Sequence, residues 1–263
     1  MRKKAIFFDI DGTLLSSENE RHFCIQPSTW TALHRLKESG HIVAISSGRP
    51  ELFIHKYFPG IFTNYVAMNG AHVVVDGRTV FEEFFSPEQV RNLMRYFDRY
   101  GCWYNFVGNA NGWACHVPED RIEPLNASYG MAGYLKTEWE PEDVHASILD
   151  FVFRDEEHYR QCKPAFQDPM VLNKHPGSLA ADLSFKGQDK SRGVQIFLEK
   201  AGVPPEDAYA IGDGYNDITM MSVVGNSIAM GNAVEELKEV VDYVTADIFH
   251  DGVYKALSHY CLL

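Results

Sequence analysis

Short apolar runs and amphipathic stretches alternate along the first third of the chain. Residues 4–8, 41–46 and 65–68 are mostly apolar and rich in β-branched or aromatic side chains, as buried strands are. Residues 27–39 place apolar side chains at three-residue intervals, which predicts a helix, and a shorter helix is expected at residues 51–57. Strands that alternate with helices usually pair in parallel, with helices on both faces of the sheet. The pattern therefore predicts an α/β fold with a parallel sheet.

From about residue 81 the pattern changes to short strands mixed with helices. Strands are expected at residues 81–85, 103–107, 112–117, 148–153 and 179–185, helices at 87–99 and 156–166, and less regular chain at 129–135. This mixture is typical of an inserted α+β domain, which we place at residues 83–183. The parallel pattern then returns, with helices at 191–201 and 216–223 and strands at 208–211, 226–230 and 243–244. The core is thus predicted to comprise residues 1–82 and 184–263.

Polar side chains stand at the expected ends of three strands of the core. Asp9 and Asp11 follow the first strand, Ser47 follows the second and Asn69 follows the third. In open parallel sheets, ligands bind beyond the carboxyl ends of the strands. The sequence therefore predicts a functional site at this edge of the sheet.

The segment Asp9-Ile10-Asp11-Gly12-Thr13 carries the most specific chemistry. In extended backbone, residues two apart leave the same face, and a buried carboxylate pair is costly unless a cation or a shared proton offsets it. An EF-hand loop is excluded, since it requires Gly at its sixth position and Glu at its twelfth. The alternative is an ordinary polar turn, but the full pattern after an apolar strand favours a divalent metal with a nucleophilic carboxylate and an acid–base carboxylate.

A second group of carboxylates follows the expected strand at residues 208–211. In Gly212-Asp213-Gly214-Tyr215-Asn216-Asp217, the two aspartates are four residues apart at the start of a predicted helix. Metal ligation is favoured for Asp213. For Asp217, metal ligation and capping of the helix N-terminus are about equally supported.

Two further segments have features of a phosphate site. Ser47-Gly48-Arg49 joins a strand to a helix, so a hydroxyl, backbone amides and a helix N-terminus come together. Lys190 begins the helix that follows the inserted domain. An ordinary solvated lysine is the alternative, but a carboxylate nucleophile and a phosphate dianion together require a fixed positive charge.

Composition excludes several classes of function. The chain has 263 residues, 24 Lys plus Arg against 36 Asp plus Glu, a formal charge of −12 and no basic stripe, so nucleic acid is not an expected partner. No segment approaches the roughly 18 consecutive apolar residues of a membrane span, and the acidic pair at residues 9–11 interrupts any signal peptide. The five scattered cysteines are typical of reduced thiols, which indicates a cytoplasmic protein.

These residues resemble the haloacid dehalogenase-like (HAD) hydrolase superfamily over the whole chain, and most closely its Cof-type, subfamily IIB branch. The motifs that carry the resemblance are Asp9–Thr13, Ser47-Gly48-Arg49, Lys190 and residues 212–220. It implies a Rossmann-like, doubly wound parallel-sheet core with an inserted α+β cap of the C2B type. Relatives usually place Gly directly after the motif lysine, whereas Ser191 follows Lys190 here, so Lys186 is the alternative for that lysine.

The resemblance also implies a mechanism, Mg²⁺-dependent hydrolysis of small phosphomonoesters such as sugar phosphates. Asp9 would attack phosphorus and Asp11 would act as acid and base. Mg²⁺ would be held by Asp9, the Asp11 backbone carbonyl and Asp213, with Asp217 in support. The phosphoryl group would be bound by Ser47, Gly48, Lys190 and Asn216.

Other expectations stay open at this point. A phosphomutase or phosphotransferase of the same superfamily is the first alternative, and a non-catalytic protein that binds a phosphorylated metabolite is the second. A small phosphorylated metabolite is the expected partner, and the chain is expected to be a monomer or a small homo-oligomer. Candidate contacts for the leaving group are Trp103, Tyr104, Asn105, Trp113, His116 and Asp182, for each of which packing or a surface position is the stronger interpretation.

Overall fold

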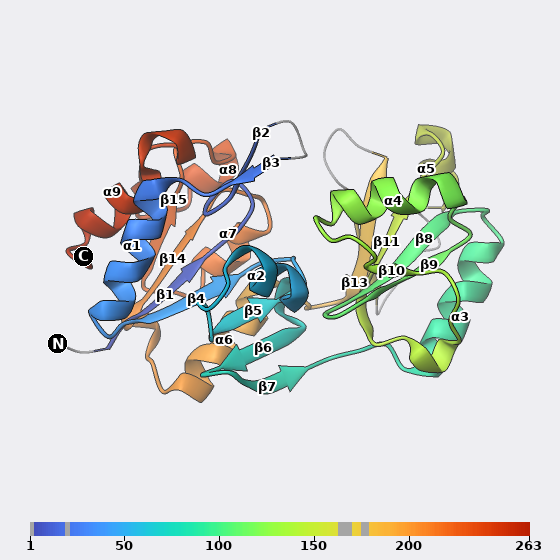
Figure 1. The fold of residues 1–263 in the computed structure, drawn as a ribbon, viewed down its shortest axis with the longest axis horizontal. Coiled ribbons are helices and arrows are strands. Elements are labelled where there is room, and N and C mark those ends of the chain that lie inside the picture. The colour runs from blue at the N-terminus through green and yellow to red at the C-terminus, as the bar shows by residue number, and fades with distance from the viewer. Residues whose placement is uncertain (1–2, 19–21, 163–169, 175–178) are drawn as a thin grey trace. The chain divides into compact units, whose positions relative to one another are not determined.

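The computed structural model of the protein describes residues 3–18, 22–162, 170–174 and 179–263 (Figure 1). The chain divides into two compact units. The first comprises residues 1–49, 54–82 and 189–263, and the second comprises residues 50–53 and 83–188. The second unit therefore extends to Gln188, five residues beyond the boundary that the sequence suggested.

The first unit is built on an eight-stranded sheet with the order β16-β15-β14-β1-β4-β5-β6-β7. The strands are β1 (Ala5–Phe8), β4 (Ile42–Ser46), β5 (Tyr65–Ala67), β6 (His72–Val75), β7 (Arg78–Glu82), β14 (Ala208–Gly212), β15 (Asn226–Ala229) and β16 (Tyr243–Val244). Pairing is parallel from β16 through β5, which confirms the predicted α/β class. In register, Phe8 lies opposite both Ile45 and Ile211, so β1, β4 and β14 end at the same level.

Helices cover both faces of this sheet (Figure 1). They are α1 (Pro27–Glu38), α2 (Glu51–Tyr57), α6 (Lys190–Ala201), α7 (Asp217–Met221), α8 (Glu235–Lys238) and α9 (Gly252–His259). Phe197 of α6 packs edge-on against Phe7 of β1, with ring centroids 5.1 Å apart. Both rings belong to an apolar core shared by α6, α7 and the central strands. Helix α6 is thus fixed directly against the middle of the sheet.

The strand predicted at residues 81–85 is displaced toward the C-terminus from the strand that the structure has. Strand β7 ends at Glu82 and pairs antiparallel with β6, which the sequence analysis did not identify. Asp76 and Gly77 join the two strands with φ values of 49° and 73°. Two consecutive residues with positive φ form the turn that suits the twist of a hairpin. An Asp-Gly pair after three valines was the available sequence signal for this hairpin.

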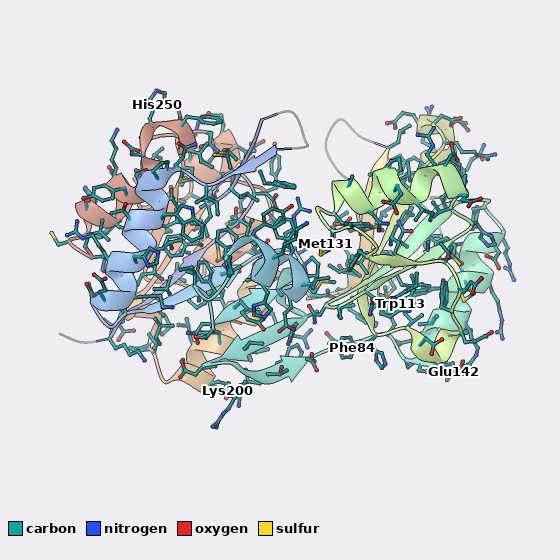
Figure 2. The ribbon with its side chains drawn as sticks, in the orientation of Figure 1. Phe84, Trp113, Met131, Glu142, Lys200 and His250 are labelled. Atoms are coloured by element: carbon teal, nitrogen blue, oxygen red, sulfur yellow. The ribbon has the colours of Figure 1, made fainter. Side chains whose placement is uncertain are left out.

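The second unit is an α+β domain with a six-stranded sheet in the order β10-β9-β8-β11-β13-β12. Its strands are β8 (Trp103–Gly108), β9 (Gly112–Cys115), β10 (Leu135–Lys136), β11 (Ala146–Val152), β12 (Met170–Lys174) and β13 (Ala180–Phe185). Its helices are α3 (Pro87–Asp98), α4 (Glu119–Ser128) and α5 (Glu156–Cys162). Neither α4 nor β12 was predicted, and the predicted end of the helix at residues 163–166 lies outside the described residues. Trp113 packs in the core of this unit (Figure 2).

Minor elements complete the described chain. They are the hairpin of β2 (Ser16–Glu18) and β3 (His22–Cys24) and the 3-10 turns η1 (Met68–Gly70), η2 (Pro141–Asp143), η4 (Pro205–Asp207) and η5 (Ile248–His250). Within the ranges that the structure describes, no helix is both long enough and apolar enough to cross a membrane.

All five cysteines are free thiols, as the sequence indicated. Two of them, Cys102 and Cys162, share a buried cluster with His158 in the second unit. The His158 ring is already bound on both sides, because Nδ1 accepts a hydrogen bond from the Arg154 amide (3.1 Å) and Nε2 lies 2.8 Å from the Tyr100 carbonyl. Burial also raises the pKa of Cys102 to about 12. The cluster is therefore a neutral part of the core, since a metal would need a thiolate and an unprotonated ring nitrogen.

Candidate active site

Three carboxylates meet where β1 and β14 end. One oxygen from each of Asp9, Asp213 and Asp217 lies within 4.8 Å of the others. Asp9 directly follows β1, Asp213 directly follows β14, and Asp217 is the first residue of α7. Asp9 and Asp217 are buried. The level ends of the two parallel strands thus bring together side chains that are about 200 residues apart in the sequence.

Lys190 is the cation at the centre of this group. Its Nζ donates hydrogen bonds of 2.6 Å to Oδ1 of Asp9 and 2.6 Å to Oδ1 of Asp217, and its side chain is fully buried. Asp189 caps α6 by accepting from the Arg192 amide, so the helix begins at the lysine. Lys186, the alternative that the sequence left open, is exposed and belongs to the second unit. Lys190 is therefore the lysine that the fold places among the carboxylates.

A close approach of backbones holds the first turn of α6 in place. A Cβ on Gly193 would lie 2.3 Å from Cγ1 of Val66 and 2.7 Å from Cα of Gly70. Distances this short are not tolerated, so only glycine permits α6 to lie so close to β5 and the turn after it. Gly193 stands three positions after Lys190, on the first turn of the same helix.

The electrostatic balance of the group favours a further cation. Burial raises the pKa of Asp9 well above its usual range, and Lys190 opposes this shift. Burial, followed by repulsion from Asp217, raises the pKa of Asp213 to about 7, although the Thr13 hydroxyl donates to Asp213 over 2.9 Å. Burial alone would lower the pKa of Lys190, but Asp217 and Asp9 together raise it. Three carboxylates and one ammonium leave excess negative charge, which a divalent cation on oxygen ligands would offset.

Asp217 does not cap the helix that it begins, so that alternative was wrong. Its Oδ2 accepts hydrogen bonds of 2.9 Å from the amides of Asp213 and Gly214, and its Oδ1 accepts from Lys190. These three bonds tie the loop after β14 to the lysine. A Cβ on Gly212 would lie 2.4 Å from the Asp217 carboxyl carbon, so the loop requires a glycine there. Asn216, a predicted phosphate contact, is exposed beside this loop.

Asp11 points to a different partner. Arg49 Nε donates to its Oδ2 and Arg49 Nη2 donates to its Oδ1, both over 2.8 Å, which is a bidentate ion pair. The Asp11 side chain is 46% exposed, in contrast to the buried Asp9. The two carboxylates of the first motif are therefore separated by both environment and partner. Arg49 belongs to a motif in the sequence that did not reveal its role, and its place after the strand beside β1 was the available indication.

The turn after β4 lies beside the turn after β5. Ser47 is buried, and its hydroxyl accepts a hydrogen bond from the Arg49 amide over 3.1 Å. The Asn69 amide donates to the Ser47 carbonyl, and Asn69 itself adopts the left-handed region with φ 48°. Oδ1 of Asn69 is a buried acceptor without a hydrogen-bond partner among the described residues, and it lies 3.1 Å from where a Cβ on Gly48 would be. Asn69 thus belongs with Ser47 and Gly48 at the predicted anion site.

Another asparagine fixes the loop that carries Asp11. Nδ2 of Asn232 donates to the Gly12 carbonyl over 2.9 Å, and its Oδ1 accepts from the Ile248 amide. Gly12 has φ +81°, and a Cβ there would lie 2.1 Å from Oδ2 of Asp213. The loop therefore depends on a glycine for both its backbone conformation and its proximity to Asp213.

Comparison with known proteins places this geometry in a family. A family model of haloacid dehalogenase-like hydrolases matches residues 6–257. YkrA of Bacillus subtilis strain 168, which is named as a candidate phosphatase, is 28% identical over 272 residues, 100% of each chain. A crystal structure of a hypothetical protein from Geobacillus kaustophilus HTA426 has 30% identity and a TM-score of 0.86, with 100% of each chain covered. The structure of BT4131, a HAD subclass IIB sugar phosphatase, has 26% identity and a TM-score of 0.81, covering 99% of this chain and 100% of that one.

The chain belongs to the haloacid dehalogenase-like hydrolases, as its motifs predicted. Within that family it is a phosphatase of the Cof type.

Proposed function

We propose that the protein is a Mg²⁺-dependent phosphatase that hydrolyses small phosphomonoesters, sugar phosphates or related metabolites, through an aspartyl-phosphate intermediate. The observation that carries the proposal is the buried Asp9 carboxylate, which shares Lys190 with Asp217 and lies beside Asp213. The sugar phosphatase BT4131 supports the substrate class. The free cysteines are in keeping with action in the cytoplasm.

In the first step, a carboxylate oxygen of Asp9 attacks phosphorus, and the bond from phosphorus to the leaving oxygen breaks. Asp11 gives its proton to that oxygen, so the product leaves as an alcohol. In the second step, Asp11 takes a proton from water, whose oxygen attacks phosphorus and releases Asp9 and inorganic phosphate. Lys190, Ser47, the Gly48 amide and Asn216 bind the phosphoryl oxygens, with Lys190 supplying fixed positive charge.

The residues present fit a magnesium ion. Asp9, Asp213 and the Asp11 backbone carbonyl would hold it, and Asp217, which already accepts three hydrogen bonds, would support the site. All of these donors are oxygens, as Mg²⁺ prefers. When bound, the ion neutralises negative charge where the phosphoryl group meets the carboxylates.

A panel of phosphate esters tests the proposal. With Mg²⁺ present, we expect phosphate release from small phosphomonoesters and its loss on addition of EDTA. Transfer of the phosphoryl group between sugar positions without free phosphate would instead favour a mutase or phosphotransferase. Binding of an ester with no release from any member of a broad panel would favour a non-catalytic sensor.

The stabilising effect of Mg²⁺ is expected to increase with pH. The pKa of Asp213 is raised in the folded protein to about 7 from an ordinary value of 3.8, so between these values the folded state retains a proton that the unfolded state has lost. Without metal, stability therefore falls as pH rises through this window. Mg²⁺ binds the deprotonated carboxylate and reverses this loss.

Thermal unfolding with MgCl₂ or EDTA measures this effect, and the difference in Tm should be larger at about pH 8 than at about pH 5. In Asp213→Asn, the pH dependence of that difference should become smaller, and the part that comes from Asp9, whose pKa burial also raises, should remain. A metal effect equal at both pH values in the unaltered protein would contradict the assignment of Asp213.

Arg49 is expected to act through Asp11 by holding its carboxylate in one orientation. In Arg49→Gln, kcat/KM for an alkyl phosphate should fall by roughly 10²-fold, within the range for a general acid. The loss with p-nitrophenyl phosphate should be much smaller, because p-nitrophenolate leaves without protonation. Steady-state kinetics with both esters checks this.

Two variants serve as controls for Arg49. Asp11→Asn should show the same dependence on the leaving group, whereas Arg35→Gln, on the exposed surface of α1, should leave both activities unchanged. Equal losses with both esters in Arg49→Gln would instead make Arg49 a phosphate ligand.

A further inference from the structure

The turn after β5 has an unusual backbone conformation. Met68, Asn69 and Gly70 all have positive φ, with values of 54°, 48° and 91°. Glycine adopts this region freely and asparagine does so more readily than most residues, but for methionine it is costly. Strain of this kind persists only where the surrounding structure imposes it, and it is concentrated at functional sites. The contacts of this turn therefore bear on the function of the site beside it.

The turn is bonded to the carbonyls on both sides of Gly48. The Asn69 amide donates to the Ser47 carbonyl over 3.1 Å, and the Met68 amide donates to the Arg49 carbonyl over 3.3 Å. In a trans peptide the C=O and the N–H point in opposite directions, so the bond to the Ser47 carbonyl also fixes the direction of the Gly48 N–H. The same bond polarises the peptide and makes that N–H a stronger donor.

The Gly48 N–H is left available for a ligand. It donates to no atom of the residues that the structure describes. The neighbouring Ser47 hydroxyl accepts a hydrogen bond from the Arg49 amide and keeps its own proton to donate. These two donors are groups that the proposed function assigns to the phosphoryl oxygens. Their direction therefore decides how well the phosphoryl group is bound.

The Asn69 carboxamide closes the space beside the Cα of Gly48. A Cβ on Gly48 would lie 3.1 Å from Oδ1 and 3.3 Å from Nδ2 of Asn69. The Oδ1 atom is buried and has no hydrogen-bond partner within the described ranges, which is a cost to the fold. A glycine at position 69 would accept positive φ without that cost. Tolerance of the backbone conformation alone therefore does not account for the asparagine.

The same turn contacts the start of α6. A Cβ on Gly70 would lie 2.1 Å from the Asp189 carbonyl oxygen and 3.2 Å from the Gly193 amide nitrogen. Lys190, the first residue of α6, lies between these two along the chain. All of these residues, and residues 47–49, belong to the first unit. One turn thus touches both segments that would bind the phosphoryl group.

We propose that Asn69 is a positioning residue of the phosphate site, which directs the Gly48 N–H toward the phosphoryl group. The proposal rests on the proposed function, in which Ser47, Gly48 and Lys190 bind the phosphoryl oxygens. The Asn69 backbone amide orients the peptide that carries the donor, and its carboxamide prevents Gly48 from moving. The contact of Gly70 with Asp189 keeps this donor at a fixed distance from the start of α6.

Asn69→Gly removes the carboxamide but keeps a residue that accepts positive φ. With p-nitrophenyl phosphate, we expect kcat to fall by roughly 10- to 100-fold while KM changes by less than about threefold, because a misdirected donor matters most where charge develops. Tm should change little, since glycine is compatible with the backbone at this position. Steady-state kinetics and thermal unfolding measure these effects. An asparagine that served only the backbone conformation would be replaced by glycine without loss of kcat.

Asn69→Asp is a second, independent variant. It keeps the shape of the side chain and its tolerance of positive φ, but it places negative charge beside Gly48. Competitive inhibition by inorganic phosphate should then weaken by at least about tenfold, because two anions a few Å apart repel each other strongly. A purely structural role would leave this inhibition constant unchanged.

Cys261→Gly is the matched control. Cys261 is exposed and has φ 52°, so the variant also puts glycine in place of a residue with positive φ, but far along the chain from the phosphate segments. It should leave kcat, KM and inhibition by phosphate unchanged. Circular dichroism confirms that each variant is folded. Unchanged kcat in Asn69→Gly, or unchanged inhibition in Asn69→Asp, would overturn the proposal.

The activity of the unaltered protein separates this proposal from the proposed function. If p-nitrophenyl phosphate is hydrolysed and neither Asn69 variant has an effect, the positioning role fails while the phosphatase assignment holds. If no ester is hydrolysed, the proposed function fails, and calorimetric binding of inorganic phosphate with Mg²⁺ decides the role of Asn69. Binding that Asn69→Asp weakens and Cys261→Gly does not would support the proposal. Equal binding by all three proteins, or no binding by the unaltered one, would overturn it.

Discussion

Replacement of Asp9 by asparagine is expected to abolish phosphate release while the protein stays folded. The amide lacks the anionic oxygen that would attack phosphorus, so turnover should fall by at least roughly 10⁴-fold. Stability should change little or increase, because burial already penalises the charged carboxylate and Asn removes repulsion with Asp213 and Asp217. Phosphate release with Mg²⁺ and thermal unfolding measure the two effects.

Asp76→Asn provides the matched control for Asp9→Asn. Asp76 lies in the β6–β7 turn with positive φ, which asparagine accepts, so activity and Tm should both be retained. A folded Asp9→Asn protein that retained substantial turnover would show that Asp9 is not the nucleophile. Loss of turnover together with unfolding would leave the role of Asp9 to be decided by trapping the phosphorylated protein with labelled substrate.

Replacement of Lys190 by methionine is expected to remove activity and a large part of the stability. The methionine side chain fills much of the same space but leaves the Asp9 and Asp217 carboxylates buried without their shared cation. Breaking a buried ion pair in this way costs about 3–5 kcal/mol. Denaturant unfolding in EDTA measures the loss of stability, and ester hydrolysis measures the loss of function.

Conditions that neutralise the carboxylates should restore part of the stability of Lys190→Met. Without the lysine, the pKa values of both carboxyls rise further, so at about pH 5 a larger share is protonated and the deficit should shrink relative to about pH 8. Lys186→Met is the control, because Lys186 is exposed and should contribute little. Equal stability of Lys190→Met and Lys186→Met would contradict the central role of Lys190.

The sequence was most informative where local pattern and tertiary structure agree. Strand β1 is a short apolar run that ends in two carboxylates, and β14 repeats this arrangement, so the site followed from where parallel strands end. The choice between Lys190 and Lys186 could not be made from sequence, since Lys186 lies just before helix α6 and Lys190 begins it. It depends on burial, and burial becomes visible only when α6 packs against β5 and the turn after it.

Other features lay beyond the reach of periodicity. The ion pair of Arg49 with Asp11 joins the segments that follow two neighbouring strands, β4 and β1, and no spacing along the chain encodes it. Helix α4 contains Pro124, which weakens the helical pattern, and its apolar positions are few. The alignment of Asn105, Asp150 and Asp182 depends on the register between β8, β11 and β13, which is fixed by pairing across the sheet.

Two boundaries between the units lie close in sequence to the cations of the site. One passage falls between Arg49 and Pro50, and another falls between Gln188 and Asp189, one residue before Lys190. Arg49, which engages Asp11, and Lys190, which engages Asp9, therefore each lie within two residues of such a boundary. The charge balance of the carboxylates is thus set by two cations that are next to the second unit along the chain.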